Sequence, residues 1–390
     1  MKKNTAKVFV CLFIISAAAA LEITVPEFYI GLHGAKYPGM SDVSFYQESA
    51  IKFRLLQGKY FYSDFDTALN IPNPAGFFHP DKDIRSLGEF SFFNFSLNFP
   101  HMSGRPLSFA IFSGVHPSLT GQQQSFDLLK HGTMPVRMAD SDISSCFLPP
   151  LIRENIGLSL SGLIANSGYL GASFGCNAKT SATQEYGLYI QGGAFANIVV
   201  CNAFAAMHIA EKAEKVSMSA DVSLLFPIQD YFSLYLGTGL SKTDVRDPAV
   251  QHVLLSNSYV FFEPRLRFAH ADIDVTFFVS SIKTTNRTGV FPSRLLMPFS
   301  YRNNDLYAGC NIFAAMGNPD IERLQGGCHL LTAINIHDAK NSSSLVCAVT
   351  PFFAVYLGPC SIDLRATVFP LAYTQPESMV EGKISIKRDL

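Results

Sequence analysis

Apolar and polar side chains alternate with a period of two along most of this chain. From Val216 to Phe226 every second side chain is apolar, and Ser217 to Ser223 alternate with them as serines and one aspartate. Because successive side chains of a β-strand point to opposite faces, this period predicts a strand with one apolar face. The segment 231–241 repeats the pattern after Pro-Ile-Gln-Asp, a connection of hairpin length.

The same alternation recurs over almost the whole remaining length. Between Ile84 and Lys387 it marks about fourteen or fifteen segments, each roughly ten residues long. Short turns alternate with longer connections, notably 115–153 and 286–303, either of which could line a mouth. Further clear examples are 154–164, 168–176, 272–280, 305–316, 328–336 and 360–369.

A membrane barrel explains this pattern better than a soluble sandwich, although a soluble β protein also alternates. One face is rich in Gly, Ser, Asn and Tyr, and the other carries Phe, Leu, Val and Ile. Charged residues make up 16% of the chain, against about 25% in soluble domains. The segments are long enough to cross a bilayer as tilted strands. We therefore expect an all-β fold, a transmembrane antiparallel barrel of about fourteen strands.

The N-terminus has the features of an export signal. A basic start is followed by an apolar run and by Ala18-Ala19-Ala20, a small-residue cleavage pattern. We expect residues 1–21 to be removed and the mature protein to lie in the outer membrane. The chain has eight cysteines, and none of those after Cys11 forms a Cys-x-x-Cys pair. They are interpreted as small apolar side chains rather than a metal site.

Charged residues on the alternating strands are expected to face the lumen and to pair there. A charge facing lipid near the middle of the membrane is expensive. Their position near strand ends, in the headgroup region, is the alternative. The predicted lumen charges are Glu263, Arg265, Arg267, Asp272, Asp274, Asp363 and Arg365.

The segment Phe-Asp-Thr-Ala-Leu-Asn-Ile-Pro-Asn-Pro-Ala-Gly-Phe-Phe (65–78) precedes the regular alternation. Proline fixes its own φ, restricts the residue before it, and glycine permits a positive φ, so a tight reversal is expected. The stretch resembles the signature of the long-chain fatty acid transporter family of outer-membrane porins (FadL-like, OmpP1/toluene X). The matching residues are Asp66, Thr67, Ala68, Asn73, Pro74, Ala75 and Gly76.

This resemblance implies a fourteen-stranded barrel whose N-terminal segment plugs the lumen as a hatch. The domains would then be a signal peptide (1–21), a hatch (22–83) and a barrel (84–390). The implied function is import of hydrophobic molecules such as long-chain fatty acids. Two departures stand out: the Gly/Ala-rich stretch before the motif is reduced, and the chain ends in Leu390 rather than an aromatic residue.

Other functions find little support in the sequence. Gly171 to Gly175 matches the Gly-x-Ser-x-Gly nucleophile pattern, but Ser173 lies within an alternating strand and no helix follows. No enzyme activity and no cofactor or metal are predicted. The net charge of −1 gives no reason to expect nucleic acid binding. The expected partners are membrane lipids, an apolar ligand and the outer-membrane assembly machinery. The alternative function is a surface barrel that acts as an adhesin or structural protein without transport.

Overall fold

The fold is an antiparallel sheet of 18 strands. No helix among the described residues is long and apolar enough to cross a membrane. The computed structural model describes residues 22–35, 44–57, 61–71, 89–100, 107–115, 153–164, 167–180, 183–196, 198–210, 215–245, 257–281, 306–317, 322–336, 345–357, 360–368, 370 and 380–389.

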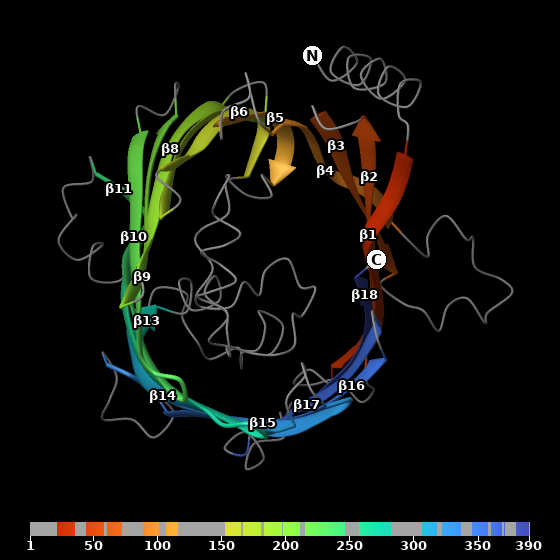
Figure 1. Cartoon of the computed structure of the whole chain (residues 1–390), viewed down its shortest axis with the longest axis vertical. Coiled ribbons are helices and arrows are strands. Elements are labelled where there is room, and N and C mark those ends of the chain that lie inside the picture. Colours follow the sequence, from red (N-terminus) through yellow and green to blue (C-terminus); the bar gives the residue numbers. More distant parts are fainter. Residues whose placement is uncertain are drawn as a thin grey trace, which may run out of the picture.

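The sheet returns to its starting strand. Each strand pairs with the next one along the chain, and β1 (Glu22–Ala35) pairs with both β2 (Ser44–Gln57) and β18 (Val380–Asp389). The β1–β18 ladder runs from Glu27 opposite Asp389 to Ala35 opposite Glu381. Figure 1 shows the result, a ring in sequence order with red β1 beside blue β18. Such a ring satisfies the backbone polar groups of its edge strands, which a wall in lipid requires.

The strands are long enough to cross a bilayer, from 9 residues in β17 to 15 in β10. Those between β2 and β18 are β3 (Phe61–Ile71), β4 (Glu89–Phe99), β5 (Leu107–Val115), β6 (Arg153–Ile164), β7 (Gly168–Thr180), β8 (Thr183–Ala196), β9 (Val199–Ala210), β10 (Lys215–Gln229), β11 (Phe232–Asp244), β12 (Ser258–Arg267), β13 (Ala271–Ser281), β14 (Leu306–Met316), β15 (Leu324–Asn335), β16 (Leu345–Leu357) and β17 (Cys360–Val368).

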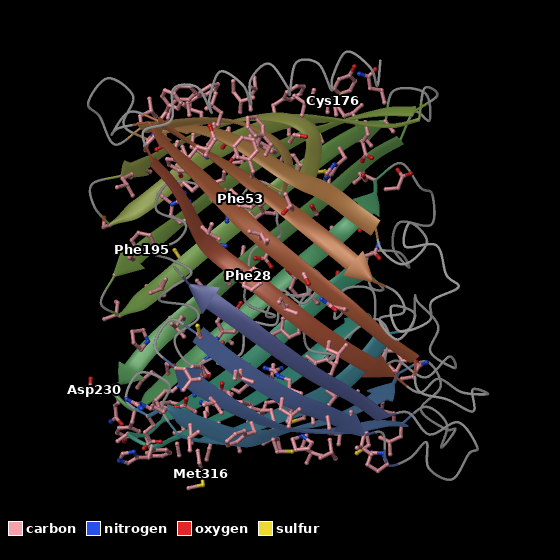
Figure 2. All side chains as sticks on the ribbon, turned by 90° about the vertical axis from the view of Figure 1, so that its right-hand side faces the viewer. Phe28, Phe53, Cys176, Phe195, Asp230 and Met316 are labelled. Atoms are coloured by element: carbon pink, nitrogen blue, oxygen red, sulfur yellow. The ribbon has the colours of Figure 1, made fainter. Side chains whose placement is uncertain are left out.

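The two ends of the barrel differ in the length of their connections. One end has short turns, such as Asp230–Tyr231 between β10 and β11 and residues 268–270 between β12 and β13. The other end has the long connections 116–152 and 282–305. Phe195 and Asp230 mark the short-turn end in Figure 2. This asymmetry is typical of outer-membrane barrels.

The wall has an apolar outer face and an inner face with many polar side chains. Leu158 and Phe262 are 46% and 42% exposed on the outer face. The inner face is identified by Phe112 of β5, which packs with Tyr189 of β8 and Phe204 of β9. β5 is not a neighbour of β8 or β9 in the sheet, so the Phe112 side chain meets the other two on the concave side of the sheet. The predicted alternation between two faces is therefore confirmed.

Aromatic side chains on the inner face lie over glycines of the next strand. A Cβ atom built on Gly157 would come within 2.3 Å of the Phe112 ring. The glycine thus provides the space in which the ring lies flat along the wall. The same relationship joins Tyr169 to Gly193, Tyr259 to Gly239, and Phe278 to Gly309.

The predicted hatch over 22–83 is wrong for the described part of that range, and so is the number of strands. Residues 22–35, 44–57 and 61–71 form β1, β2 and β3, three strands of the wall. The region from β4 onwards supplies fifteen strands, as the alternation there indicated. With β1 to β3 the total becomes 18 instead of about fourteen.

A β-bulge explains why β1 lacks a simple alternating pattern. Two residues of β1, Val25 and Pro26, lie opposite the single residue Phe53 of β2. A bulge shifts the pleat by one residue, so the outer face changes from odd positions such as Ile23 to even ones such as Leu32. The period of two is broken within a strand that still pairs on both sides.

The six described cysteines all lie on the outer face, and none of them forms a disulfide. Cys176 stands opposite Ile156, and Cys310 opposite Phe277. Both partners are about half exposed on the outer face. Directly opposed residues of an antiparallel pair share a face. The six are Cys176, Cys201, Cys310, Cys328, Cys347 and Cys360.

Candidate functional site

The candidate site is a charged part of the inner face, on the β12–β13 hairpin near the short-turn end. The turn at 268–270 sets a register in which Arg265 stands opposite Asp274 and Arg267 opposite Asp272. Acid and base therefore alternate across the two strands. This is an arrangement in which opposed charges stabilise a sheet.

Arg267 makes the contacts of this cluster that lie nearest the turn. Its guanidinium donates to both carboxylate oxygens of Asp274, over 2.6 and 3.0 Å. Its Nε lies 3.8 Å from Asp272. Two parallel hydrogen bonds to one carboxylate fix the orientation of both groups. Arg267 is thus held along the wall rather than extended into the lumen.

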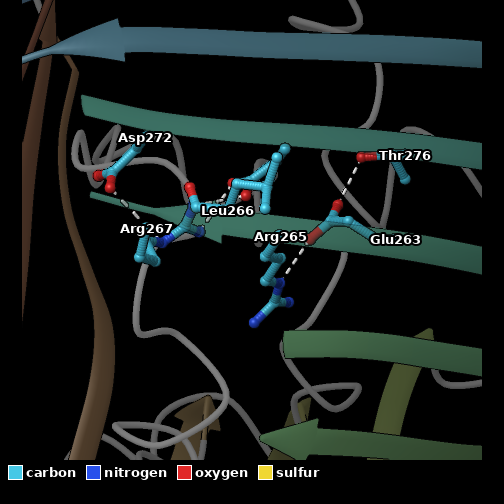
Figure 3. A network of polar contacts seen from close by, with 7 residues as sticks. Glu263, Arg265, Leu266, Arg267, Asp272 and Thr276 are labelled. Atoms are coloured by element: carbon cyan, nitrogen blue, oxygen red, sulfur yellow. Dashed lines mark hydrogen bonds and ion pairs between the residues drawn. The ribbon is translucent and has the colours of Figure 1, made fainter. Parts of the chain in front are cut away.

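Glu263 and Arg265 form a second ion pair one pleat further from the turn. Arg265 Nε donates to Glu263 over 2.7 Å, and Arg265 is fully buried. Its guanidinium carbon lies 4.8 Å from the ring centre of Tyr235. Thr276 donates to the other oxygen of Glu263. Figure 3 shows Glu263 between Arg265 and Thr276. Both charges are therefore paired, as buried charges must be.

A similar ion pair lies on the inner face of β2 and β3. Arg54 donates to both carboxylate oxygens of Asp64, over 2.7 and 2.9 Å, and lies 4.5 Å from the ring centre of Tyr62. The cross-strand row from Asp64 through Ser96 to Phe112 places the pair on the inner face. In a ring of 18 strands, β12 is nine strands from β3 in either direction. The two charged clusters therefore face each other across the barrel.

Further polar groups line the inner face between these two clusters. On β7 to β9, Tyr169 donates to the amide oxygen of Asn202, and Gln191 donates to the same oxygen over 3.3 Å. The Tyr169 ring reaches Asn202 across Gly193, where a Cβ atom would come within 2.5 Å of the ring. The three polar side chains are buried. These three side chains are uncharged and hydrogen-bonded to one another.

An aromatic cluster with a cation lies on β14 to β17. The imidazole of His329 is 4.8 Å from the ring centre of Phe313 and 5.7 Å from that of Phe352. Phe313 and Phe352 stack at 5.7 Å. Arg365 lies 5.7 Å from the Phe352 ring centre on a neighbouring strand. The inner face here offers flat rings and one positive charge.

Five of the seven predicted lumen charges come together in the β12–β13 cluster. Arg365 lies apart from them, on β17, within the aromatic cluster. Asp363 is on the same strand, opposite Ala354 of β16, and its side chain is outside the described residues. The five are Glu263, Arg265, Arg267, Asp272 and Asp274.

Only the first part of the predicted hatch motif lies in the described residues. Asp66 and Thr67 belong to β3, and the Thr67 hydroxyl donates to the backbone oxygen of Ile51 over 3.3 Å. Both residues are therefore part of the wall. The remaining motif residues, Asn73, Pro74, Ala75 and Gly76, lie outside the described residues, as do the connections 116–152 and 286–303.

Sequence reasoning missed the pair of Arg54 and Asp64 and the carboxylate of Asp221. The signal for the pair was present, because Arg54 alternates with Phe53 and Leu55, and Asp64 precedes Phe65. Because residues 22–83 were predicted to form a hatch, these two residues were not considered as charges on the barrel wall. Ser173 was placed on the polar face correctly: it is buried and donates to Ser159 over 3.0 Å, while Phe174 is exposed. No metal-binding group of His, Cys, Asp or Glu occurs among the described residues.

These features define a closed antiparallel β-barrel with an apolar outer face and polar groups on its inner face. The solved structure of OccAB2 from Acinetobacter baumannii superposes with a TM-score of 0.54 at 12% identity, over 95% of this chain and 98% of that chain. A mutant porin of Rh. blastica gives a TM-score of 0.47 at 11% identity, over 95% of this chain and 100% of that chain. No family model and no curated protein matches the chain. The likeness concerns the fold, and the resemblance to fatty acid transporters stays a prediction.

Proposed function

We propose that this protein is an outer-membrane channel through which small polar solutes diffuse. The observation that carries the proposal is the difference between the two faces of the wall. The outer face presents side chains such as Leu158 and Phe262, which suit lipid. The inner face presents buried polar groups such as Gln191 and Asn311 and the paired charges of two opposed clusters. A polar interior behind an apolar outer band is the design of a water-filled barrel.

We also propose that the chain is exported and then inserted into the outer membrane. Residues 1–21 would direct export and be removed, and the outer-membrane assembly machinery would insert the barrel. Membrane lipids would then surround the outer face. The fold has the short turns at one end and the long connections at the other, and both described termini are at the short-turn end. By the rule for such barrels, that end faces the periplasm.

Import of a long-chain fatty acid is the second candidate. The observation in its favour is the apolar inner cluster of Phe112, Tyr189, Phe204 and Ala206. Against it, Phe95 and Leu97 lie on the outer face, in register with Phe65 and Ile111. They do not extend the cluster into an apolar track. An inner face with two ion-pair clusters suits polar solutes better.

Conductance in planar lipid bilayers tests the proposal. The mature chain, refolded in detergent, should give stepwise current increases in potassium chloride, and heat-denatured protein should give none. Liposomes that contain it should swell in small sugars. If the folded barrel produces neither current nor swelling, the channel is refuted and the adhesin or structural alternative is favoured.

A binding assay separates the second candidate. A transporter should bind a fluorescent long-chain fatty acid and lose it when Asn73→Ala and Pro74→Ala are combined. A polar channel should show no saturable binding in either form.

A further inference from the structure

Asp221 occupies the middle of β10 on the inner face. It is the seventh of the 15 residues from Lys215 to Gln229. In the ladder it stands opposite Phe204 of β9 and Gly239 of β11. Because Phe204 belongs to the inner cluster, Asp221 shares that face. The carboxylate is therefore near the midpoint of the wall, away from both ends of the barrel.

The carboxylate of Asp221 is held by a hydroxyl group. Tyr259 of β12 donates to it from two strands away, with its ring lying over Gly239. A neutral hydroxyl orients the carboxylate and leaves its negative charge in place. The oxygen atoms are thus fixed on the wall without being neutralised.

Asp221 differs in this respect from Asp64, Asp274 and Glu263 of the inner wall. Asp64 and Asp274 each accept two hydrogen bonds from an arginine, and Glu263 is paired with Arg265. Asp221 is half-buried. Among the described residues no cation lies within ion-pair distance of it. Its charge therefore contributes to the field in the lumen, whereas the arginines bound to Asp64, Glu263 and Asp274 largely cancel the charges of these three acids.

We infer that Asp221 makes the channel prefer cations, an inference that rests on the proposed diffusion function. A lumen enclosed by a low-dielectric wall focuses the field of an uncompensated charge. Acidic side chains in such a position favour cations in channels. The ligand class is small cations, and potassium is the simplest probe. Arg54 and Asp64 on β2–β3 cancel each other, whereas the β12–β13 cluster has one carboxylate more than it has guanidinium groups, and its excess charge lies near the short-turn end rather than at mid-wall.

Reversal potentials in a potassium chloride gradient test this inference. In the wild-type channel the reversal potential should be displaced from zero toward the equilibrium potential of potassium. In Asp221→Asn, which keeps the shape and the acceptor for Tyr259, the potassium-to-chloride permeability ratio should fall by about tenfold, because one unit charge at roughly 6 Å in water attracts the cation about threefold and repels the anion about threefold. Single-channel conductance should change much less than selectivity.

Tyr259→Phe is the matched control variant. It removes the hydroxyl group but keeps the ring over Gly239 and the charge of Asp221, so the cation preference should persist. An unchanged ratio in Asp221→Asn overturns the inference while leaving the channel function intact. Equal losses in both variants overturn it as well, because the cause would then be structural. A wild-type barrel that folds but never conducts refutes the channel and the inference together.

Discussion

The ring of Tyr259 lies over Gly239 so closely that a Cβ atom at the glycine would come within 2.4 Å of the tyrosine oxygen. This contact lets a side chain of β12 reach Asp221 of β10 across the strand between them. The wall is therefore connected laterally by side chains as well as by the backbone ladder. The same device recurs where Tyr169 reaches Asn202 across Gly193.

Replacing Gly239 with alanine should destabilise the barrel. The added methyl group would displace the Tyr259 ring and break its hydrogen bond to Asp221, at a cost of about 1–3 kcal/mol. The measurement is the temperature at which the folded band is lost on a semi-denaturing gel. Gly326→Ala is the control, since a Cβ atom there meets nothing closer than 3.7 Å. Equal stability of the two variants would contradict the close contact.

Replacing Arg265 with alanine should cost about 3–5 kcal/mol, because Glu263 would keep a buried charge without its partner. Urea unfolding in detergent, followed by far-UV circular dichroism, measures the change; the chain has no tryptophan to report it. Combining Arg265→Met with Glu263→Gln should recover much of the loss. If the single variant were as stable as the double one, the pair would not be buried.

A charge on the outer face should be costly in proportion to its depth. Val222 lies at the centre of β10 and is 44% exposed. Val222→Arg should destabilise the barrel in lipid by about 2–4 kcal/mol, and Leu324→Arg, at the start of β15, by about 1 kcal/mol or less. Unfolding in lipid vesicles measures both. A reversed order would place the outer face in water rather than lipid.

The outer-face cysteines should react only with reagents that dissolve in lipid. In membranes that contain a Cys146→Ser variant, an uncharged maleimide should label Cys176 and Cys310, and a charged maleimide should not. Both reagents should label the protein after denaturation in detergent and urea. Peptide mass spectrometry locates the labels. Modification of Cys201 by the charged reagent in the intact barrel would show that this residue faces water, and would contradict its position on the outer face.

The sequence by itself determined the strands from β4 onwards and the two faces of the wall. Alternation is local: each position from Val216 to Phe226 reveals its face through its neighbours two residues away. The pairing of Arg267 with Asp272 and Asp274 was predictable for the same reason, because a short turn joins adjacent strands. The outward position of Phe174 and the inward position of Ser173 followed from the same pattern.

Only the tertiary structure decided how the ring closes and what meets across it. The bulge at Val25 and Pro26 breaks the alternating pattern of β1. The strand that closes the ring with β1 is β18, at the other end of the chain. No local pattern reports a partner so distant. The contact of Tyr259 with Asp221 likewise depends on the register of three strands at once. Closure and register are set by hydrogen bonds between strands that lie far apart in the chain. The local pattern of apolar and polar residues does not show which distant strands form them.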